Sequence, residues 1–182
     1  MKIIFFDIDG TLICGGSELM SESTKEAIRI ARANGHICMI NTGRTKRLVG
    51  ENLTGQVEFD GLLLGCGTEI EYHGKQLMHK TFSMEDSKAI LTAMKKYHVD
   101  AVLEGSREDY APRGEEVFTE TFRHMAREIE NRKYDRYANA PGNYDKLYAY
   151  AETLAGMDGM KHDLSEICLL YTSPSPRDRS LS

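Results

Sequence analysis

Lys2-Ile3-Ile4-Phe5-Phe6-Asp7-Ile8-Asp9-Gly10-Thr11 is the stretch that decides the fold class. Residues 2–6 form a short apolar run that ends in an acidic turn, which is typical of a buried strand. Such a strand delivers Asp7 and Asp9 to its carboxyl end, where open α/β sheets bind their ligands. The opening stretch therefore predicts an α/β fold with two carboxylates at the ligand-binding edge of its sheet.

A helix is predicted over about residues 23–34. Ser23 and Glu26 have the spacing of a capping box, in which a hydroxyl and a carboxylate cap the first turn of a helix. An apolar stripe follows, and Asn34-Gly35 is a typical helix stop. This helix would connect the first strand to the next one.

A second buried strand, residues 37–40, follows that helix and leads directly into Asn41-Thr42-Gly43-Arg44. Two strands joined by a helix in this way are parallel, and their connection is right-handed. Both strands therefore end at the same edge of the sheet. We expect Asp7, Asp9 and Thr42 to lie near one another there.

The rest of the chain divides into two blocks near residue 80. Before that point we predict a short helix over about 44–51, a strand at 62–64, and a hairpin of strands 69–72 and 75–79. After it we predict helices over 85–97 and 117–131, strands over 101–103 and 146–151, and a polar loop over 105–116. This order predicts a Rossmann-like parallel-sheet core over 1–79 and an α+β unit over 80–167.

The composition excludes several classes of protein. The 182 residues carry a formal net charge of -5, so there is no basic excess to neutralise the phosphates of a nucleic acid. No apolar run has the length of a membrane span, and no secretory signal segment precedes the first strand, so we expect a cytoplasmic protein. Cysteines lack a CxxC pair, and histidines such as His73 and His79 lack metal-ligand spacing, which favours surface or loop positions for the histidines.

Two aspartates one residue apart suit the cleavage of a phosphate ester through a covalent intermediate. One carboxylate can attack phosphorus. A second group must protonate the leaving oxygen and then deprotonate the attacking water. Carboxylate oxygens also suit Mg²⁺, which would offset the repulsion between two carboxylates and a phosphate. In the second motif, Thr42 offers a hydroxyl to the phosphate, Gly43 allows close approach of a main-chain N–H, and Arg44 can pair with an anionic substrate group.

The combination of Asp-Ile-Asp-Gly-Thr-Leu at 7–12 with Asn-Thr-Gly-Arg at 41–44 resembles the haloacid dehalogenase (HAD) superfamily. It is most similar to the Cof-like phosphatases, which carry a class II, subtype B cap. The resemblance implies that Asp7 is the nucleophile, that Asp9 is the general acid and base, and that Thr42 binds the phosphoryl group. It also implies that Mg²⁺ is held by the Asp7 side chain and the Asp9 main-chain carbonyl.

The same resemblance implies that residues 1–79 form the N-terminal part of the catalytic core. Residues 80–167 would then be part of an inserted α+β cap. Cys66-Gly67 stands where the family usually has Asn-Gly after the third strand, which leaves a substrate role for that position open.

Two later motifs of the family, a lysine and a Gly-Asp…Asp segment, are not found in the chain. Lys146 and Lys161 fall inside the predicted cap, and Asp158-Gly159 lacks a flanking apolar strand. We therefore expect the chain to stop before the cap is finished. An incomplete core would leave the first strand as an exposed apolar edge. Residues 168–182 are predicted to be a non-native tail, because residues 168–178 resemble the translation of a sequencing adapter.

The resemblance implies that the full-length protein hydrolyses a small phosphorylated metabolite with Mg²⁺, through an aspartyl-phosphate intermediate. We expect the 182-residue chain alone to be inactive. A phosphomutase and a non-catalytic phosphometabolite-binding protein are the alternatives. The substrate, with sugar phosphates, flavin mononucleotide and pyridoxal phosphate as options, and the oligomeric state stay open. Four polar side chains are candidates to face the substrate: Glu104, Arg107, Tyr110 and Arg113.

Overall fold

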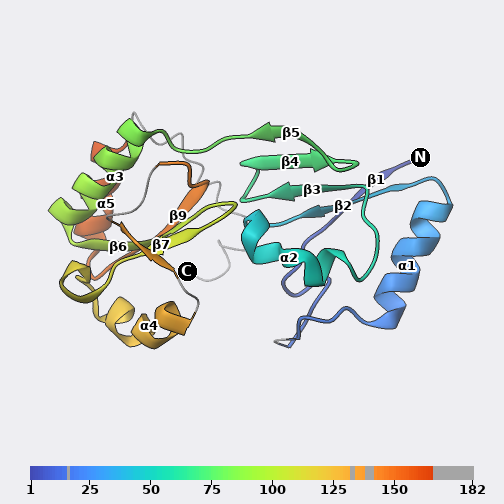
Figure 1. Cartoon of the computed structure of the whole chain (residues 1–182), viewed down its shortest axis with the longest axis horizontal. Helices are drawn as coiled ribbons and strands as arrows, with labels where there is room; N and C mark the ends of the chain where they lie inside the picture. Colours follow the sequence, from blue (N-terminus) through green and yellow to red (C-terminus); the bar gives the residue numbers. More distant parts are fainter. Residues whose placement is uncertain (16, 132–133, 138–141, 166–182) are drawn as a thin grey trace.

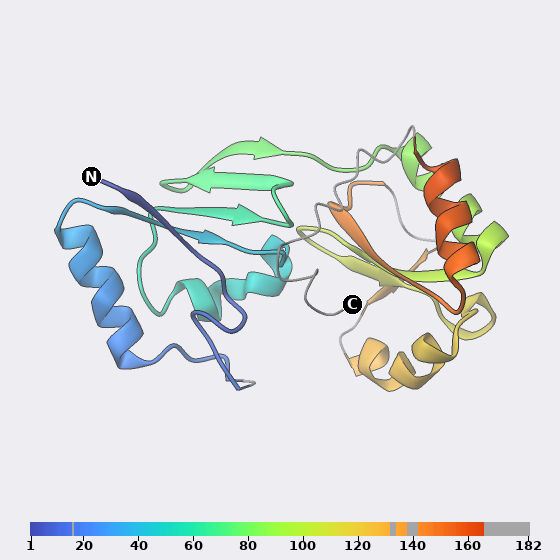
Figure 2. The same cartoon turned by 180° about the vertical axis from the view of Figure 1, so that it is seen from behind.

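The computed structural model describes residues 1–15, 17–131, 134–137 and 142–165, which form two sheets and their helices (Figures 1 and 2). The first sheet has the strand order β1-β2-β3-β4-β5. Its elements are β1 (Ile3–Phe6), α1 (Glu22–Ala33), β2 (Ile37–Asn41), α2 (Lys46–Thr54), β3 (Gly61–Leu64), β4 (Glu69–Tyr72) and β5 (Lys75–His79). The elements predicted for this part of the chain are confirmed, with small shifts of their ends.

Three parallel strands bring the polar turns of the first sheet to one edge. β1 pairs with β2 so that Phe6 lies opposite Ile40, and β2 pairs with β3 so that Asn41 lies opposite Leu63. The hairpin of β4 and β5 continues the sheet in antiparallel fashion. The predicted α/β class with a Rossmann-like parallel arrangement is therefore confirmed.

One hydrophobic core lies between the first sheet and its two helices, which cover the same face of that sheet (Figure 1). Ile28 comes from α1 and Leu53 from α2, and both are buried against Ile40 and Leu64 of the central strands. Burial of side chains of this size contributes about 1.5–3 kcal/mol each relative to exposure. Because both helices lie on one side, the crossovers wind in the same sense, as expected for right-handed connections.

The first helix starts slightly earlier than its sequence pattern suggests. Ser21, and not Ser23, is the N-cap, and its hydroxyl accepts the Thr24 N–H at 3.1 Å. The helix ends at Asn34-Gly35 as predicted, with Gly35 at a φ of +76°, in the left-handed region. The start of this helix contains more than one serine that could be the N-cap. The capping-box spacing therefore predicted the helix but not the capping residue.

Strand β1 lies at an edge of the first sheet. In the described part of the chain it pairs with β2 alone. The side chains of Ile3 and Phe5, on the face away from α1 and α2, are 54% and 51% exposed. The expected apolar edge is therefore present, and such an edge favours aggregation unless another element covers it.

The second sheet has the order β8-β7-β6-β9. Its elements are α3 (Met84–Tyr97), β6 (Val99–Glu104), β7 (Asp109–Ala111), the 3₁₀ helix η1 (Gly114–Glu116), α4 (Glu120–Asn131), β8 (Asp135–Arg136), β9 (Lys146–Ala151) and α5 (Leu154–Asp163). Alternate residues of β6 pack in two different hydrophobic cores. Ala101 and Leu103 pack with α3 and α5, whereas Val102 packs with Phe122 of α4.

The predictions for the second block were wrong in three places. The polar loop over 105–116 contains β7 and η1, α4 begins at Glu120 and not at 117, and β8 and α5 were not foreseen. β7 is only three residues long and begins with a buried aspartate, so it has no apolar run. α5 contains two glycines, and a Cβ at Gly159 would collide with the Tyr97 ring, which explains a helix of low propensity.

Residues 168–182, predicted to be a non-native tail, lie outside the described residues. None of the helices in the described ranges combines the length and the apolar character that crossing a bilayer requires.

Candidate active site and interdomain cavity

The turn after β1 holds the two aspartates of the first motif. Asp7 is half-buried, and one of its carboxylate oxygens accepts the N–H of Ile8 at 2.8 Å. Gly10 has a φ of +76°, and its N–H donates to the Ile13 carbonyl at 2.9 Å, which closes the turn. The Asp9 side chain is 61% exposed. The turn therefore presents one recessed and one open carboxylate.

Arg44 joins the second motif to the first. Its Nε donates to Oδ2 of Asp9 at 2.9 Å, and its Nη2 donates to Oδ1 of the same carboxylate at 2.6 Å. Nη1 lies 3.4 Å from the Leu48 carbonyl in α2. A guanidinium and a carboxylate joined by two parallel hydrogen bonds form one of the stronger polar pairs in proteins. The two motifs, 35 residues apart in sequence, thus meet at the carboxyl end of the parallel strands.

Thr42 and Gly43 directly follow β2, at the same edge of the sheet. Thr42 is 4% exposed, and its hydroxyl oxygen accepts the Arg44 N–H at 3.2 Å. The Cys66 N–H donates to the Thr42 carbonyl at 3.3 Å, so the turn after β3 closes over the turn after β2. A Cβ at Gly43 would lie 3.3 Å from the Cys66 Sγ, which leaves little room for any other residue there.

The departure at Cys66 has a conformational consequence. Cys66 has a φ of 61°, in the left-handed region, where asparagine and aspartate are several-fold enriched among non-glycine residues. The asparagine expected at this position would therefore suit the main chain. Cys66 is exposed beside Thr42 and Gly43, so the position remains at the site although its side chain differs.

The oxygen atoms of the first motif fit a magnesium ion. No described residue donates a hydrogen bond to the second carboxylate oxygen of Asp7 or to the main-chain carbonyl of Asp9. Both are hard oxygen donors, and Mg²⁺ takes few protein ligands besides water and substrate phosphate. The donor set is thus compatible with the ion that the family resemblance implies.

The lysines considered in the sequence lie away from this edge. Lys146 on β9 forms an ion pair with Glu104 at 2.8 Å, within the second sheet. Lys161 is exposed on α5. Within the described ranges, Arg44 is the cation that pairs with Asp9, and no lysine forms an ion pair with either aspartate.

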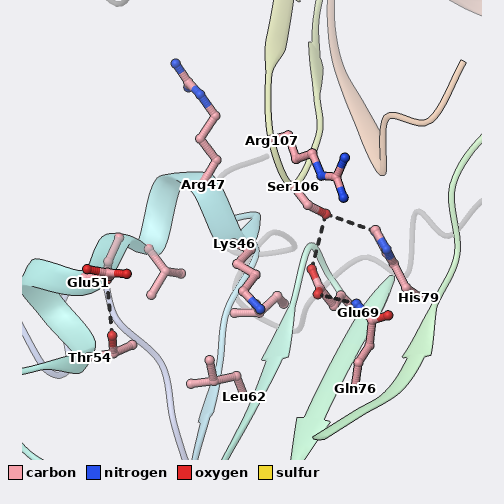
Figure 3. Close-up of a pocket in the computed structure, with 13 residues that line it drawn as sticks. Lys46, Arg47, Glu51, Thr54, Leu62, Glu69, Gln76, His79, Ser106 and Arg107 are labelled. Carbon is pink, nitrogen blue, oxygen red and sulfur yellow. Dashed lines mark hydrogen bonds between the residues drawn. The ribbon is translucent and has the colours of Figure 1, made fainter. Parts of the chain in front are cut away.

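A cavity of about 560 Å³ lies between the two sheets, next to α2 (Figure 3). Its walls come from α2, from strands β3 to β5, and from the turn between β6 and β7. The lining residues are Lys46, Arg47, Val49, Gly50, Glu51, Thr54, Leu62, Leu64, Glu69, Gln76, His79, Ser106 and Arg107. The predicted site residues Asp7, Asp9, Thr42, Gly43 and Arg44 are not among them, although Lys46 begins the helix two residues after Arg44.

Of the four polar candidates between Glu104 and Arg113, only Arg107 lines this cavity. Tyr110 is 6% exposed and packs in the core of the second sheet. Glu104 pairs with Lys146, and the Arg113 guanidinium donates to the Tyr134 carbonyl. Three of the four therefore stabilise the second sheet.

Arg47 of α2 forms an ion pair with Asp109 of β7 and so connects the helix to the second sheet. The Asp109 side chain is fully buried. Burial raises the pKa of Asp109 above its ordinary value, and the Arg47 charge and the Gly105 N–H offset only part of that rise.

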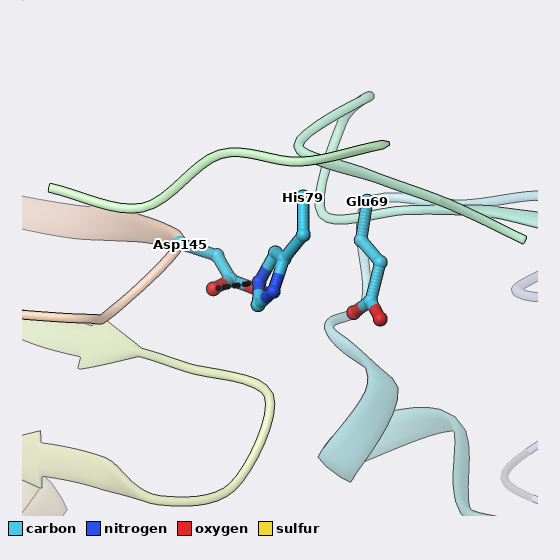
Figure 4. A group of neighbouring side chains, drawn as sticks. All are labelled: Glu69, His79 and Asp145. Carbon is cyan, nitrogen blue, oxygen red and sulfur yellow. Dashed lines mark hydrogen bonds and ion pairs between the residues drawn. The ribbon is translucent and has the colours of Figure 1, made fainter. Parts of the chain in front are cut away.

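A second polar cluster joins the sheets at the other wall of the cavity (Figure 4). His79 Nε2 lies 2.8 Å from Asp145 Oδ1. The Ser106 Oγ lies 2.9 Å from Asp145 Oδ2, 3.0 Å from His79 Nε2 and 3.2 Å from Glu69 Oε2. Burial raises the pKa of Asp145, and the nearby Glu69 charge adds to the rise, whereas His79 and Ser106 lower it.

His79 was predicted to lie at the surface or in a loop, and it is exposed at the end of β5, with a ring nitrogen within 4.8 Å of carboxylate oxygens of Glu69 and Asp145. Glu69 and His79 are cross-strand partners in the β4–β5 hairpin, and cross-strand partners present their side chains on one face. This pairing depends on a β-bulge between Ile70 and Glu71, because the regular register from Tyr72 and Lys75 would place Met78 opposite Glu69. Asp145 is separated from His79 by 66 residues, and no pattern in the sequence indicated their contact.

Comparisons with known proteins agree with the fold and the motifs. Solved structures with a similar fold include a hypothetical protein from Geobacillus kaustophilus (TM-score 0.68, 21% identity, 90% of this chain and 62% of that one). A phosphatase of the HAD superfamily from Bacteroides thetaiotaomicron gives a TM-score of 0.72 at 19% identity, over 89% of this chain and 60% of that one. A HAD subclass IIB sugar phosphatase gives a TM-score of 0.64 at 20% identity, over 92% of this chain and 64% of that one.

This chain therefore spans between 60% and 64% of the length of these three structures. A search of curated protein sequences gives no significant match. The model of one family, the haloacid dehalogenase-like hydrolases, matches residues 4–174, which include both motifs and both sheets. The chain belongs to the haloacid dehalogenase-like hydrolase family.

Proposed function

We propose that the full-length protein hydrolyses small phosphorylated metabolites in a Mg²⁺-dependent reaction that passes through an aspartyl phosphate on Asp7. The observation that carries this proposal is the pairing of Asp9 with Arg44 beside Asp7, at the carboxyl ends of parallel strands. Because the chain spans less than two thirds of the similar structures, the activity is assigned to the whole protein. Residues 80–167 would form part of its cap.

The first half of the reaction breaks the ester bond. An Asp7 carboxylate oxygen attacks phosphorus, and the bond from phosphorus to the ester oxygen breaks. Protonated Asp9 gives its proton to the leaving oxygen, so the alcohol departs neutral. Bound Mg²⁺, held by the Asp7 carboxylate and the Asp9 carbonyl, would reduce the repulsion between the phosphate and the aspartates.

The second half regenerates the enzyme. The Asp9 carboxylate takes a proton from water, and the water oxygen attacks phosphorus of the aspartyl phosphate. The bond between phosphorus and the Asp7 oxygen breaks, which releases inorganic phosphate and restores both carboxyl groups to their starting state. Asp9 must therefore alternate between a protonated and an ionised form.

Arg44 must release Asp9 for this cycle to start. In the structure the guanidinium donates to both Asp9 oxygens, so neither oxygen is free to face a leaving group. A substrate phosphate carries more charge than a carboxylate and can compete for the guanidinium. Arg44 would then bind the substrate, and Asp9 would become free to carry its proton. Thr42 keeps its hydroxyl proton for a phosphate oxygen, because its oxygen accepts the Arg44 N–H.

The proposal is tested by measuring phosphate release from p-nitrophenyl phosphate and from sugar phosphates. Sugar phosphates come first because one of the similar structures is a sugar phosphatase. We expect the full-length protein to turn over with Mg²⁺, to lose activity in EDTA, and to lose it with Asp7→Asn. Turnover that survives both treatments would contradict the proposal.

Two further outcomes distinguish the alternatives. Transfer of the phosphoryl group to a second sugar hydroxyl, and not to water, would indicate a phosphomutase. Binding of a phosphorylated ligand without turnover would indicate a binding protein. The 182-residue chain alone is expected to be inactive, and Mg²⁺-dependent turnover that Asp7→Asn abolishes in this chain would refute that expectation.

A further inference from the structure

Three metal-ligating side chains meet between the two sheets: Glu69, His79 and Asp145 (Figure 4). One ligand atom from each lies within 4.8 Å of the other two. Glu69 and His79 face each other across β4 and β5 of the first sheet, and Asp145 immediately precedes β9 of the second. None of the three takes part in the proposed phosphoryl transfer.

The cluster contains more buried negative charge than its neighbours balance. Glu69 is 1% exposed and Asp145 is 4% exposed. Two carboxylates at this distance repel each other, and removal from water makes the repulsion stronger. In the described ranges, His79 is the side chain that forms an ion pair with either of them, and no lysine or arginine does so. One imidazole and one serine hydroxyl face two buried carboxylates, so the cluster holds more acidic groups than basic ones and is suited to a cation.

We infer that Glu69, His79 and Asp145 bind a Zn²⁺ ion between the two sheets. Imidazole nitrogen and carboxylate oxygen are regular zinc ligands, and three protein ligands leave a fourth position open in a tetrahedral site. The imidazole separates this site from the all-oxygen set at Asp7 and Asp9, because Mg²⁺ prefers oxygen ligands. The two sites therefore differ in the class of metal that they select.

Neighbouring side chains already orient the ligands. The Gln76 side-chain amide donates to Glu69 Oε1 at 2.9 Å, on the oxygen that does not face Ser106. The Ser106 hydroxyl lies within hydrogen-bond distance of all three ligands. Partners of this kind fix ligand orientation at metal sites.

The site has a route to solvent. Glu69, His79 and Ser106 all line the cavity of about 560 Å³, so an ion can enter without unfolding the sheets (Figure 3). Because the ligands come from both sheets, the bound ion would fix the second sheet against the first. Binding to the folded chain alone would also stabilise that chain by mass action.

The first experiment titrates the EDTA-treated, dialysed chain with ZnCl₂ by isothermal titration calorimetry, and then with CoCl₂ by visible absorption. We expect one saturable zinc site per chain, unchanged by millimolar Mg²⁺, and the strong absorption of tetrahedral Co²⁺. Zinc should also raise the midpoint of thermal unfolding. The absence of a saturable site in the wild-type chain, or displacement of zinc by Mg²⁺, would overturn the inference without any variant being needed.

A matched pair of histidine variants locates the site. His79→Gln should lower zinc affinity by more than the roughly 10–100-fold that loss of an outer partner costs. His162→Gln should leave it unchanged, because His162 is 88% exposed on α5. Asp145→Asn should weaken binding as His79→Gln does, which gives a second test if one variant folds poorly, as judged by circular dichroism.

Two results would assign the zinc elsewhere and overturn the inference. Zinc binding that survives both His79→Gln and Asp145→Asn would point to the exposed thiols of Cys14 and Cys66. Binding lost in the Asp7→Asn/Asp9→Asn double variant would point to the phosphoryl site. Zinc affinity retained in that double variant is the expected result, and it separates this site from the proposed catalytic one.

Discussion

Arg44 binds both carboxylate oxygens of Asp9, through Nε at 2.9 Å and Nη2 at 2.6 Å. The pair occupies the group that the proposed reaction uses as its acid and base. The Arg44 side chain is 31% exposed and that of Asp9 is 61% exposed, so solvent weakens the pair and a competing anion can reach the guanidinium. Under the proposed mechanism, a substrate phosphate would displace this contact.

Asp9→Asn should lower kcat of the full-length protein by about 10²–10⁴-fold, because an amide cannot carry the proton in either half of the reaction. KM should change little, since asparagine keeps one acceptor for Arg44. Steady-state phosphate release checks this, with Asp86→Asn, a change at the α3 cap far from the strand edge, as the control. A variant with wild-type kcat would remove Asp9 from the mechanism.

Arg44→Ala should act mainly on KM, which we expect to rise by about 10-fold or more, because loss of a charge-assisted contact costs about 1.5–3 kcal/mol. Arg44→Lys should recover only part of the loss, since an ammonium cannot form the planar two-bond contact. Initial rates across substrate concentration separate the two parameters. An effect confined to kcat would mean that Arg44 positions Asp9 and does not bind the substrate.

The sequence predicted the first sheet well and the second less well, for physical reasons. β1, β2 and β3 are apolar runs that end in polar turns, and the helices between them predict that the three strands are parallel. β7 and β8 are too short to show a pattern, and α5 depends on packing against α3.

The candidate site follows the same division. Asp7, Asp9 and Thr42 could be predicted as candidates because strand ends in a parallel sheet meet at one edge, and their roles stay predictions. The Arg44–Asp9 contact needs a side-chain conformation that no spacing predicts. The pairing of Glu69 with His79 depends on a β-bulge that the sequence pattern does not indicate, and Asp145 approaches them only through the placement of the second sheet.

Asp100→Asn should destabilise the second sheet by about 2 kcal/mol, within the range for hydrogen bonds to a charged group. The buried Asp100 carboxylate accepts the N–H groups of Phe118 and Thr119 and the Thr119 hydroxyl, at 2.7–3.1 Å. An amide would turn a donor toward these N–H groups. Urea unfolding followed by circular dichroism measures the change. Asp158→Asn, at an exposed position, serves as the control, and equal midpoints for the two variants would contradict the prediction.

Stability of the first sheet should fall in acid because of Asp60. Burial alone would raise the pKa of Asp60, but the Arg32 guanidinium and the Cys38 N–H outweigh it and hold the pKa below its ordinary value, with His73 adding a weaker effect. A lowered folded-state pKa contributes stability above the unfolded-state pKa, and this contribution is lost as pH falls through the folded-state pKa.

Asp60→Asn tests that dependence. At neutral pH it should cost about 2 kcal/mol, less than the 3–5 kcal/mol of fully buried pairs, because the Arg32 side chain is 24% exposed. As the pH falls through the folded-state pKa of Asp60, which lies below its ordinary value, the variant and the wild type should converge, since Asp60 then becomes protonated in both states. The urea midpoints of the wild type and the variant, measured from pH 2.5 to pH 7, give this difference in stability. A difference that stays constant across that range would contradict the prediction.

Arg47 and Asp109 should show the opposite pH dependence, because burial raises the pKa of Asp109. A raised folded-state pKa favours folding below the unfolded-state pKa, and this advantage is lost as pH rises through the folded-state pKa. The groups that act on Asp109 are Arg47 on α2, which lowers its pKa, and Glu104 on β6, which raises it. At neutral pH the ionised form of the buried Asp109 carboxylate therefore depends on the positive charge of Arg47.

Arg47→Ala should then destabilise the chain by about 3 kcal/mol at neutral pH, because it leaves an uncompensated charge in the second sheet. Asp109→Asn added to Arg47→Ala should restore most of that loss, since the amide carries no charge and keeps an acceptor for the Gly105 N–H. Urea unfolding of the two single variants and the double variant gives the coupling between them. Additive losses would show that the pair is not coupled, and that α2 and β7 are held together by their other contacts.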